Sequence, residues 1–142
     1  MPSLYANGKN FALHIPFPFR SNQPVIDARM SADSGTNYTT VIGVLNTSLK
    51  SSILCFETAH TLGIGEPKKN GIRQIIQTAT GKKLTVYTHV LLVKMPGPQN
   101  EPCQMTLCPG FTDEIDGNYF GRDWGLTFCI AIDHHSVNLL KD

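Results

Sequence analysis

The stretch Val25-Ile26-Asp27-Ala28-Arg29-Met30-Ser31-Ala32-Asp33-Ser34-Gly35-Thr36 joins a strand pattern to a tight turn of small residues. Its first part, 25–32, is typical of a β-strand because apolar and β-branched side chains recur along it. The turn that follows carries a carboxylate, Asp33. Since Asp, Ser and Gly are also the residues that ordinary surface turns prefer, the stretch alone fits both a functional acid and a plain turn.

Strand patterns recur on both sides of this stretch, whereas long amphipathic helical patterns do not. The sequence predicts strands over 11–19, 38–42, 103–108 and 128–132, and a hairpin formed by 72–78 and 83–94. Pro16 and Pro18 restrict the first of these strands to a sheet edge. One short helix is expected over 56–62, ended by Gly63. The fold class is therefore predicted to be all-β, with one or two short helices.

The size and net charge of the chain limit the number of domains and the kinds of partner to be expected. The chain has 142 residues, which is the size of one domain, and a formal net charge of +1. A nucleic-acid binder or a protein that binds anionic membranes normally has a basic excess. The lysines and arginine between Lys68 and Lys83 are interpreted as solvated loop charges. We therefore expect neither a nucleic-acid nor a membrane partner.

The cysteines and histidines lack metal-site spacing. None of the four cysteines forms a Cys-x-x-Cys pair, and the five histidines are scattered except for His134-His135. No metal is predicted. The N-terminus has no continuous apolar segment, so the chain is expected to be intracellular with reduced thiols. A bridge between Cys103 and Cys108 stays open at this stage.

Two further blocks follow the Asp33 stretch in order: Ala59-His60-Thr61-Leu62-Gly63-Ile64 and Tyr119-Phe120-Gly121-Arg122-Asp123-Trp124. They are similar to the A-x-x-L-G-I and I-L-G-x-D-W-L segments of LTR-retrotransposon proteases. The hairpin around Gly81 falls where those enzymes have a flap, often T-A-D-G-x-x-L. This order of blocks resembles the retropepsins, the single-domain aspartic peptidases of retroviruses and LTR retrotransposons, over nearly the whole chain.

The resemblance implies a retropepsin-like closed β-barrel, the single lobe of the acid-protease fold, active as a homodimer without a cofactor. It implies one domain over 1–142, with 1–10 as a flexible extension and 44–52 as an inserted surface loop. Asp33 would be catalytic, and the residues that support its turn would be Ser34, Gly35 and Thr36. The flap would be formed by Thr78, Ala79, Thr80 and Gly81. Candidate pocket residues are Ile42, Ile76 and Phe120.

The expected chemistry needs two carboxyl groups. One takes a proton from water while the other, protonated, donates to the scissile carbonyl. No other Asp of the chain is followed by Thr/Ser-Gly, so two copies of Asp33 would meet at a twofold axis and share a proton. The Thr36 hydroxyl is expected to donate to the Asp33 carboxylate.

The predicted function is an aspartic endopeptidase that cleaves extended peptides, as in polyprotein processing, in the cytoplasm or within a virus-like particle. One alternative is a catalytically inactive retropepsin-like module for dimerisation or peptide binding, which the 44–52 insertion and Gly125 favour. Another is an unrelated small β-barrel binding protein.

Overall fold

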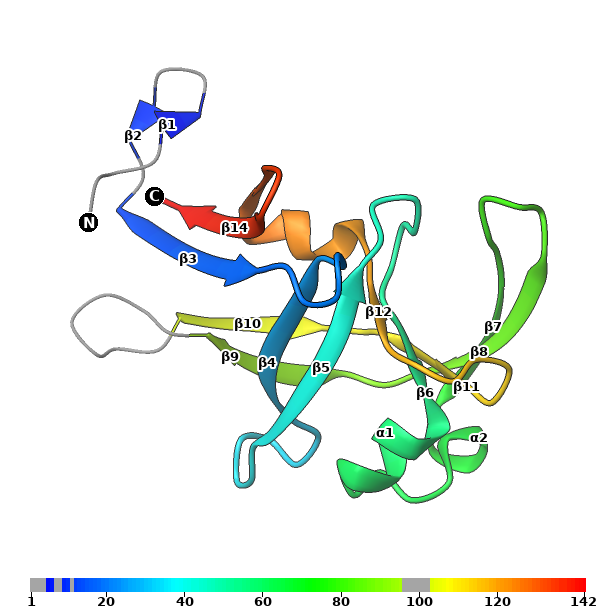
Figure 1. Cartoon of the computed structure of the whole chain (residues 1–142). Helices are drawn as coiled ribbons and strands as arrows, with labels where there is room; N and C mark the ends of the chain where they lie inside the picture. The colour runs from blue at the N-terminus through cyan, green and yellow to red at the C-terminus, as the bar shows by residue number, and fades with distance from the viewer. Residues whose placement is uncertain (1–4, 7–8, 11, 96–102) are drawn as a thin grey trace.

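The structure is a computed structural model, and it describes residues 5–6, 9–10, 12–95 and 103–142 (Figure 1). Its strands are β1 (Tyr5–Ala6), β2 (Lys9–Asn10), β3 (Leu13–Pro18), β4 (Val25–Ser31), β5 (Thr39–Leu45), β6 (Ile53–Cys55), β7 (Ile72–Gln77), β8 (Lys83–Thr88), β9 (Leu91–Met95), β10 (Cys103–Leu107), β11 (Gly110–Thr112), β12 (Tyr119–Phe120), β13 (Cys129–Ile132) and β14 (Ser136–Lys141). The helices of the described part are α1 (Phe56–Thr61), α2 (Pro67–Asn70) and the 3₁₀-helix η2 (Arg122–Leu126). This content confirms the predicted all-β class.

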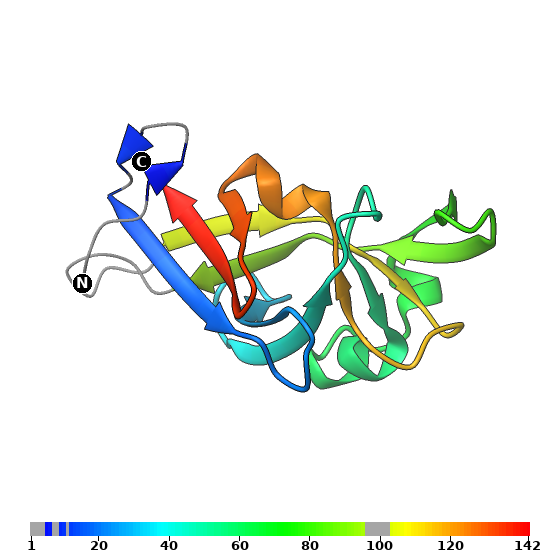
Figure 2. The same ribbon diagram turned by 45° about the horizontal axis from the view of Figure 1, so that its top comes forward.

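Nine strands form one curled sheet in the order β10-β9-β4-β5-β12-β6-β11-β8-β7. Figure 2 shows the curl, with the β7–β8 hairpin extending from one end. Within the described residues β10 and β7 pair with no further strand, so the expected barrel is an open half-barrel.

A second sheet, in the order β13-β14-β3, brings the two ends of the chain together. The strand predicted over 128–132 is not the last one of the chain. The structure instead continues through a tight turn at His134-His135 into β14, whose Val137, Leu139 and Leu140 are fully buried. Of the predicted N-terminal extension, the described residues form the antiparallel pair β1–β2.

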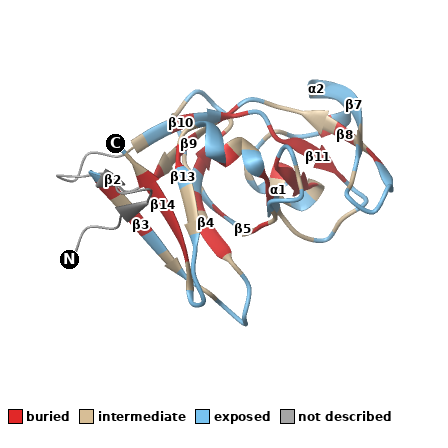
Figure 3. Cartoon of the chain, turned by 90° about the horizontal axis from the view of Figure 1, so that it is seen from above, coloured by how far each residue is buried: buried red, intermediate tan, exposed pale blue. Residues whose placement is uncertain are grey.

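The core lies between the curled sheet and the β13-β14-β3 sheet, as the buried residues in Figure 3 show. Along β5 the side chains alternate, because Val41, Gly43 and Leu45 face the core while Ile42 is 51% exposed. The ring of Phe120 packs against Gly43, where a Cβ would lie 2.7 Å from the ring. The aromatic ring of Trp124 lies next to the Phe120 ring, tilted against it by 41°, with 4.8 Å between the two centroids.

The segment 44–52 is not an inserted loop as a whole. Leu45 ends β5 and is 5% exposed, and Ser52, directly before β6, is 1% exposed. Only residues 46–51 form a turn. Residues 46–51 must cross from β5 to β6, which are not neighbours in the sheet because β12 lies between them.

Candidate functional site

Asp33 lies in the turn that joins β4 to β5, called here the Asp33 turn (residues 33–37). Its Oδ1 accepts hydrogen bonds from Ser31 Oγ at 2.7 Å and from the Asn37 backbone N–H at 2.9 Å. Its Oδ2 accepts from Asn37 Nδ2 at 2.9 Å. All three donors come from its own turn and the strand before it, so the carboxylate is held without help from the rest of the fold.

These donors stabilise the charged form of the carboxylate. The Ser31 hydroxyl, followed by the backbone and side-chain groups of Asn37, lowers the pKa of Asp33 to about 2. Asp33 is solvent-exposed. A group with this pKa is ionised throughout the neutral and mildly acidic range.

The small residues of the Asp33 turn serve its backbone shape. Ser34 and Gly35 both have positive φ, 62° and 89°, and the Gly35 N–H donates to Ser31 Oγ at 3.0 Å. Thr36 donates its backbone N–H to the Asp33 carbonyl at 3.4 Å. The predicted Thr36 hydroxyl bond to the carboxylate is wrong, since Asn37 occupies that role.

A second polar turn lies at the other end of β5. This Asn46 turn (residues 46–51) connects β5 to β6 over the end of β12, which lies between them. Phe120 of β12 pairs in parallel with Leu45, and Tyr119 pairs with Val44 on one side and Ile53 on the other. Adjacent strands are about 4.8 Å apart, so the turn spans two strand spacings.

The backbone of residues 120–122 holds the Asn46 turn in place through hydrogen bonds. The Asn46 N–H donates to the Phe120 carbonyl at 2.8 Å, and the Arg122 N–H donates to the Leu49 carbonyl at 2.8 Å. Within the turn, the Ser48 N–H donates to Asn46 Oδ1 at 3.0 Å. The turn is therefore tied to a segment more than seventy residues further along the chain.

Gly121 and Asp123 also support the Asn46 turn, and we call residues 120–123 the brace of this turn. A Cβ on Gly121 would lie 2.8 Å from the Leu49 carbonyl oxygen and 2.8 Å from the Ser51 carbonyl carbon, so only glycine fits. The Asp123 carboxylate accepts from both the backbone N–H and the hydroxyl of Ser52, each at 2.8 Å. The Ser52 hydroxyl in turn accepts from the Gly121 N–H at 3.0 Å. The Gly121-Arg122-Asp123 block is thus the support of the Asn46 turn.

The predicted flap residues 78–81 form the turn of the β7–β8 hairpin. The Thr78 N–H donates to the Lys82 carbonyl at 2.8 Å, and Gly81 has a φ of 87°. The base of the hairpin is anchored by a small apolar cluster in which Ile53, Leu84 and Val86 are buried. Leu49 of the Asn46 turn and Ile76 of β7 both pack against this cluster.

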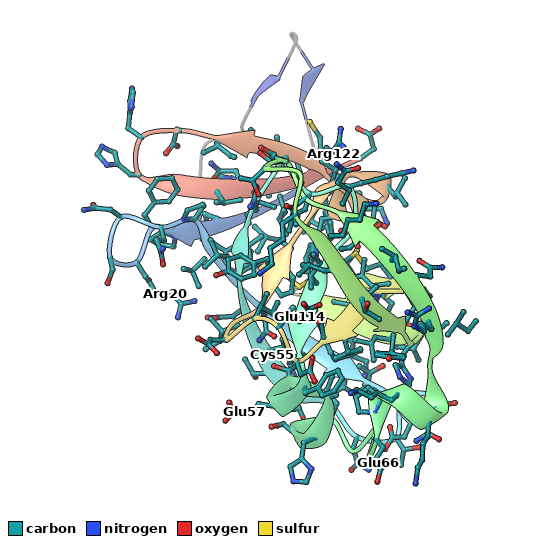
Figure 4. The ribbon with its side chains drawn as sticks, turned by 90° about the vertical axis from the view of Figure 1, so that its right-hand side faces the viewer. Arg20, Cys55, Glu57, Glu66, Glu114 and Arg122 are labelled. Carbon is teal, nitrogen blue, oxygen red and sulfur yellow. The ribbon has the colours of Figure 1, made fainter. Side chains whose placement is uncertain are left out.

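The Asn46 turn and the tip of the β7–β8 hairpin reach the same end of the molecule, at the top of Figure 1, while the Asp33 turn lies at the opposite end. In Figure 4, Arg122 lies toward the top of the molecule, and Glu57 and Glu66 lie toward the bottom. The structure therefore does not bring Asp33 together with the predicted flap.

The surroundings of Asp33 come from other elements. An open pocket of about 350 Å³ is lined by Ala32, Asp33, Leu62, Gly63, Ile64, Asn70, His89 and Val90. Apart from Ala32 and Asp33, these residues belong to the segment after α1, to α2 and to the segment between β8 and β9. Asp33 thus shares its pocket with the Leu62-Gly63-Ile64 block and not with the β7–β8 hairpin.

The three predicted pocket residues have different positions. Phe120 is fully buried, so its prediction as a pocket residue is wrong, because its ring fills the core beside Gly43. Ile42 is exposed on the outer face of β5, and Ile76 is half-buried against the small cluster. Of the three, only Ile76 lies on the same cluster as the Asn46 turn.

We also examined the described histidine, cysteine and acidic side chains for a metal site or a disulfide. No three His, Cys, Asp or Glu side chains of the described residues gather closely enough to hold a metal ion. The predicted option of a Cys103–Cys108 bridge is wrong, because β10 is extended between them, which separates their Cα atoms by about 16 Å. All four cysteines are free. In the part of the chain that the structure describes, no helix is long and apolar enough to cross a membrane.

The Asn46 turn was missed in the sequence. Its signal was present, since Thr39–Leu45 is an apolar strand followed by the small polar run Asn46-Thr47-Ser48. The prediction of 44–52 as an inserted surface loop placed no functional residue in it.

The chain was compared with solved structures and with known protein families and sequences. The chain is similar to a retropepsin-like aspartic protease from Rickettsia conorii, with a TM-score of 0.62, 15% sequence identity, and coverage of 90% of this chain and 91% of that one. It also shows a weaker similarity to EIAV protease complexed with the inhibitor HBY-793, with a TM-score of 0.43, 19% identity, and coverage of 72% and 85%. No family model and no curated protein sequence matches the chain. The first similarity shows that the fold is retropepsin-like, as predicted.

Proposed function

We propose that the chain is a retropepsin-like module that binds an extended peptide without hydrolysing it. The observation that carries this proposal is that the Asn46 turn, which lies at the hairpin end of the fold, contains no acidic residue. Peptide hydrolysis by carboxyl groups needs one group that accepts a proton and another that donates one. The amide of Asn46 does neither near neutral pH.

The β7–β8 hairpin supports the peptide-binding part of the proposal. An extended peptide is recognised by strand-like backbone hydrogen bonds and by pockets for alternate side chains. The apolar contacts would come from Leu49 and Ile76, which are only partly buried on their shared cluster. Thr78, Ala79, Thr80 and Gly81 would cover the peptide from above.

A second candidate function is hydrolysis by two Asp33 side chains in a homodimer, with polyprotein processing as its use. One observation favours it: Asp33 is an exposed carboxylate directly after a strand, in a turn of the expected sequence. One observation weighs against it, because the hairpin expected to hold the substrate is at the other end of the molecule (Figure 1).

The test uses fluorescein-labelled denatured casein as an unstructured polypeptide, from pH 4 to pH 7.5. We expect casein to remain intact on gels with the parent protein and with Asp33→Asn, and to bind both equally by fluorescence anisotropy. Ile76→Ser should weaken binding about tenfold, the loss expected for one buried apolar contact of about 1.4 kcal/mol. Val90→Ser, at an exposed position beside the Asp33 turn, is the matched control and should bind like the parent.

Two outcomes would overturn the proposal. Pepstatin-sensitive cleavage by the parent that disappears in Asp33→Asn would establish the second candidate instead. Absence of casein binding by the folded parent would remove the peptide-binding role.

A further inference from the structure

Four polar side chains form a row across the outer face of the curled sheet, called here the polar row. Gln104 of β10 is opposite Lys94 of β9. Lys94 is also opposite Arg29 of β4, which in turn is opposite Thr40 of β5. Directly opposed residues of paired strands lie on the same face. The row points away from the core, because most of its neighbours along the strands are buried, namely Ala28, Met30, Val41, Val93, Met95 and Met105.

The two central residues of the polar row, Arg29 and Lys94, carry like charges directly opposite each other. Opposed residues have Cβ atoms about 4.5–5.5 Å apart, and like charges in this position destabilise the pair. Among the described residues, no ion pair includes either side chain. The four strands contain one acidic residue, Asp27, whose carboxylate is already paired with Arg20. The two charges therefore have no counter-ion in the described part of the chain.

The ring of Tyr38 brings the two cationic groups together. Lys94 Nζ lies 4.2 Å from the ring centroid, and Arg29 Cζ lies 5.7 Å from it. Both groups are within about 6 Å, the range of a cation–π contact. A ring face is not a full hydrogen-bond acceptor, and neither side chain donates a hydrogen bond to another described residue. The N–H donors of both cations are therefore available to a ligand.

The charges indicate an anionic ligand with two negative charges. A phosphate monoester carries about −1.5 to −2 charges near neutral pH, which two adjacent cations neutralise, whereas a single carboxylate carries only one. The Arg guanidinium binds phosphate oxygens through two parallel N–H groups, and the Lys ammonium adds a point charge. Two cations in a chain of net charge +1 are too few for the extended basic surface that nucleic acid needs.

The shape of the polar row indicates a peptide. The row crosses three strand spacings, about 14 Å, and Gln104, Arg29 and Thr40 are exposed. An open sheet face buries little of a small ligand, which binds in a concave pocket. An extended peptide can instead lie along the row with its phosphate at the centre. The Gln104 amide and the Thr40 hydroxyl, at the two ends, can then bond to the peptide backbone.

We propose that the polar row binds a phosphorylated serine or threonine of an extended peptide, with Arg29 and Lys94 on the phosphate. This surface is separate from the β7–β8 hairpin, because β10, β9, β4 and β5 form the opposite end of the nine-stranded sheet from β8 and β7. Neither proposal depends on the other.

The test measures the fluorescence anisotropy of a fluorescein-labelled heptapeptide of glycine and alanine with a central phosphoserine. The same peptide with unmodified serine is the reference. Binding at the hairpin would be common to both peptides, so the difference between them measures the polar row alone. We expect phosphorylation to tighten binding by about tenfold or more. Arg29→Gln and Lys94→Gln should each remove most of this gain, whereas Arg29→Lys keeps the charge and should retain part of it.

Arg73→Gln is the matched control, because it removes an equal charge from an exposed strand position on β7, outside the polar row. It should show the full gain. All variants should keep the circular dichroism spectrum of the parent, since the substituted side chains lie outside the core. The proposal is overturned if both peptides bind the parent equally, or if folded Arg29→Gln and Lys94→Gln keep the full gain. Labelled single-stranded RNA that binds tighter than the phosphopeptide and loses binding in the same two variants would assign the pair to nucleic acid instead.

Discussion

The Asp33 turn and the Asn46 turn lie at the two ends of one strand, β5, and differ in how they are held. The Asp33 turn is self-contained, because its donors are Ser31 and Asn37, within four residues of the carboxylate. The Asn46 turn is held by residues from a distant segment, 120–123. The Asp33 turn has the residues of a known motif, whereas the Asn46 turn is the one that distant parts of the fold hold in place.

This difference shows that a local motif and a tertiary position are separate properties. A surface turn can acquire Asp-Ser-Gly for its own stability, since these residues favour tight turns. A turn braced by Gly121 and Asp123 cannot move without loss of that brace. The position supported by the fold is therefore the better guide to where a peptide would bind.

The largest expected effect comes from a substitution in the brace. Gly121→Ala would push its Cβ into the Leu49 and Ser51 backbone, and we expect a loss of about 3 kcal/mol in the free energy of unfolding measured in urea. Gly35→Ala, in the Asp33 turn, meets a strained φ and one tight contact, since the Tyr38 hydroxyl oxygen lies 3.2 Å from the added Cβ, and should cost about 1–2 kcal/mol.

Gly125→Ala is the control for this pair, because nothing lies within 4 Å of its added Cβ. It should not destabilise the protein. Equal losses from Gly121→Ala and Gly35→Ala would contradict the contrast between the two turns.

The next effect concerns the Asp123–Ser52 contact. Asp123→Ala leaves the N–H and hydroxyl of buried Ser52 without their acceptor, at a cost of about 2 kcal/mol in the same measurement. Asp123→Asn keeps one carbonyl acceptor and should lose less. If both variants unfold like the parent, the carboxylate does not support the Asn46 turn.

The smallest expected effect is the contribution of Asp33 to the pH dependence of folding stability. Its folded-state pKa, about 2, lies below the ordinary value of 3.8. The stabilisation is therefore complete above pH 3.8 and is lost as the pH falls toward 2. We expect the stability of Asp33→Asn to fall less steeply than that of the parent over this window.

The cause of that shift can be tested separately by NMR titration of the Asp33 carboxyl carbon. Ser31→Ala removes the largest contribution and should raise the pKa, and Asn37→Ala should raise it as well. An unchanged value in both variants would show that other groups hold the charge.

Local patterns predicted much of the secondary structure correctly. The apolar alternation of 25–32 predicts β4, and the β-branched flanks of the Gly81 turn predict the β7–β8 hairpin. The Phe56–Leu62 helix was predicted to within one residue. The strands β11 and β12 were missed, because segments of two or three residues carry too little periodicity.

The sequence by itself determined the all-β class, the order of its blocks and the two small-residue turns, because these depend on side-chain patterns and backbone preferences of neighbouring residues. Only the tertiary structure decided which turn the fold supports. That decision depends on β12 lying between β5 and β6, and on backbone contacts between residues 46–52 and 120–123, which no local pattern records.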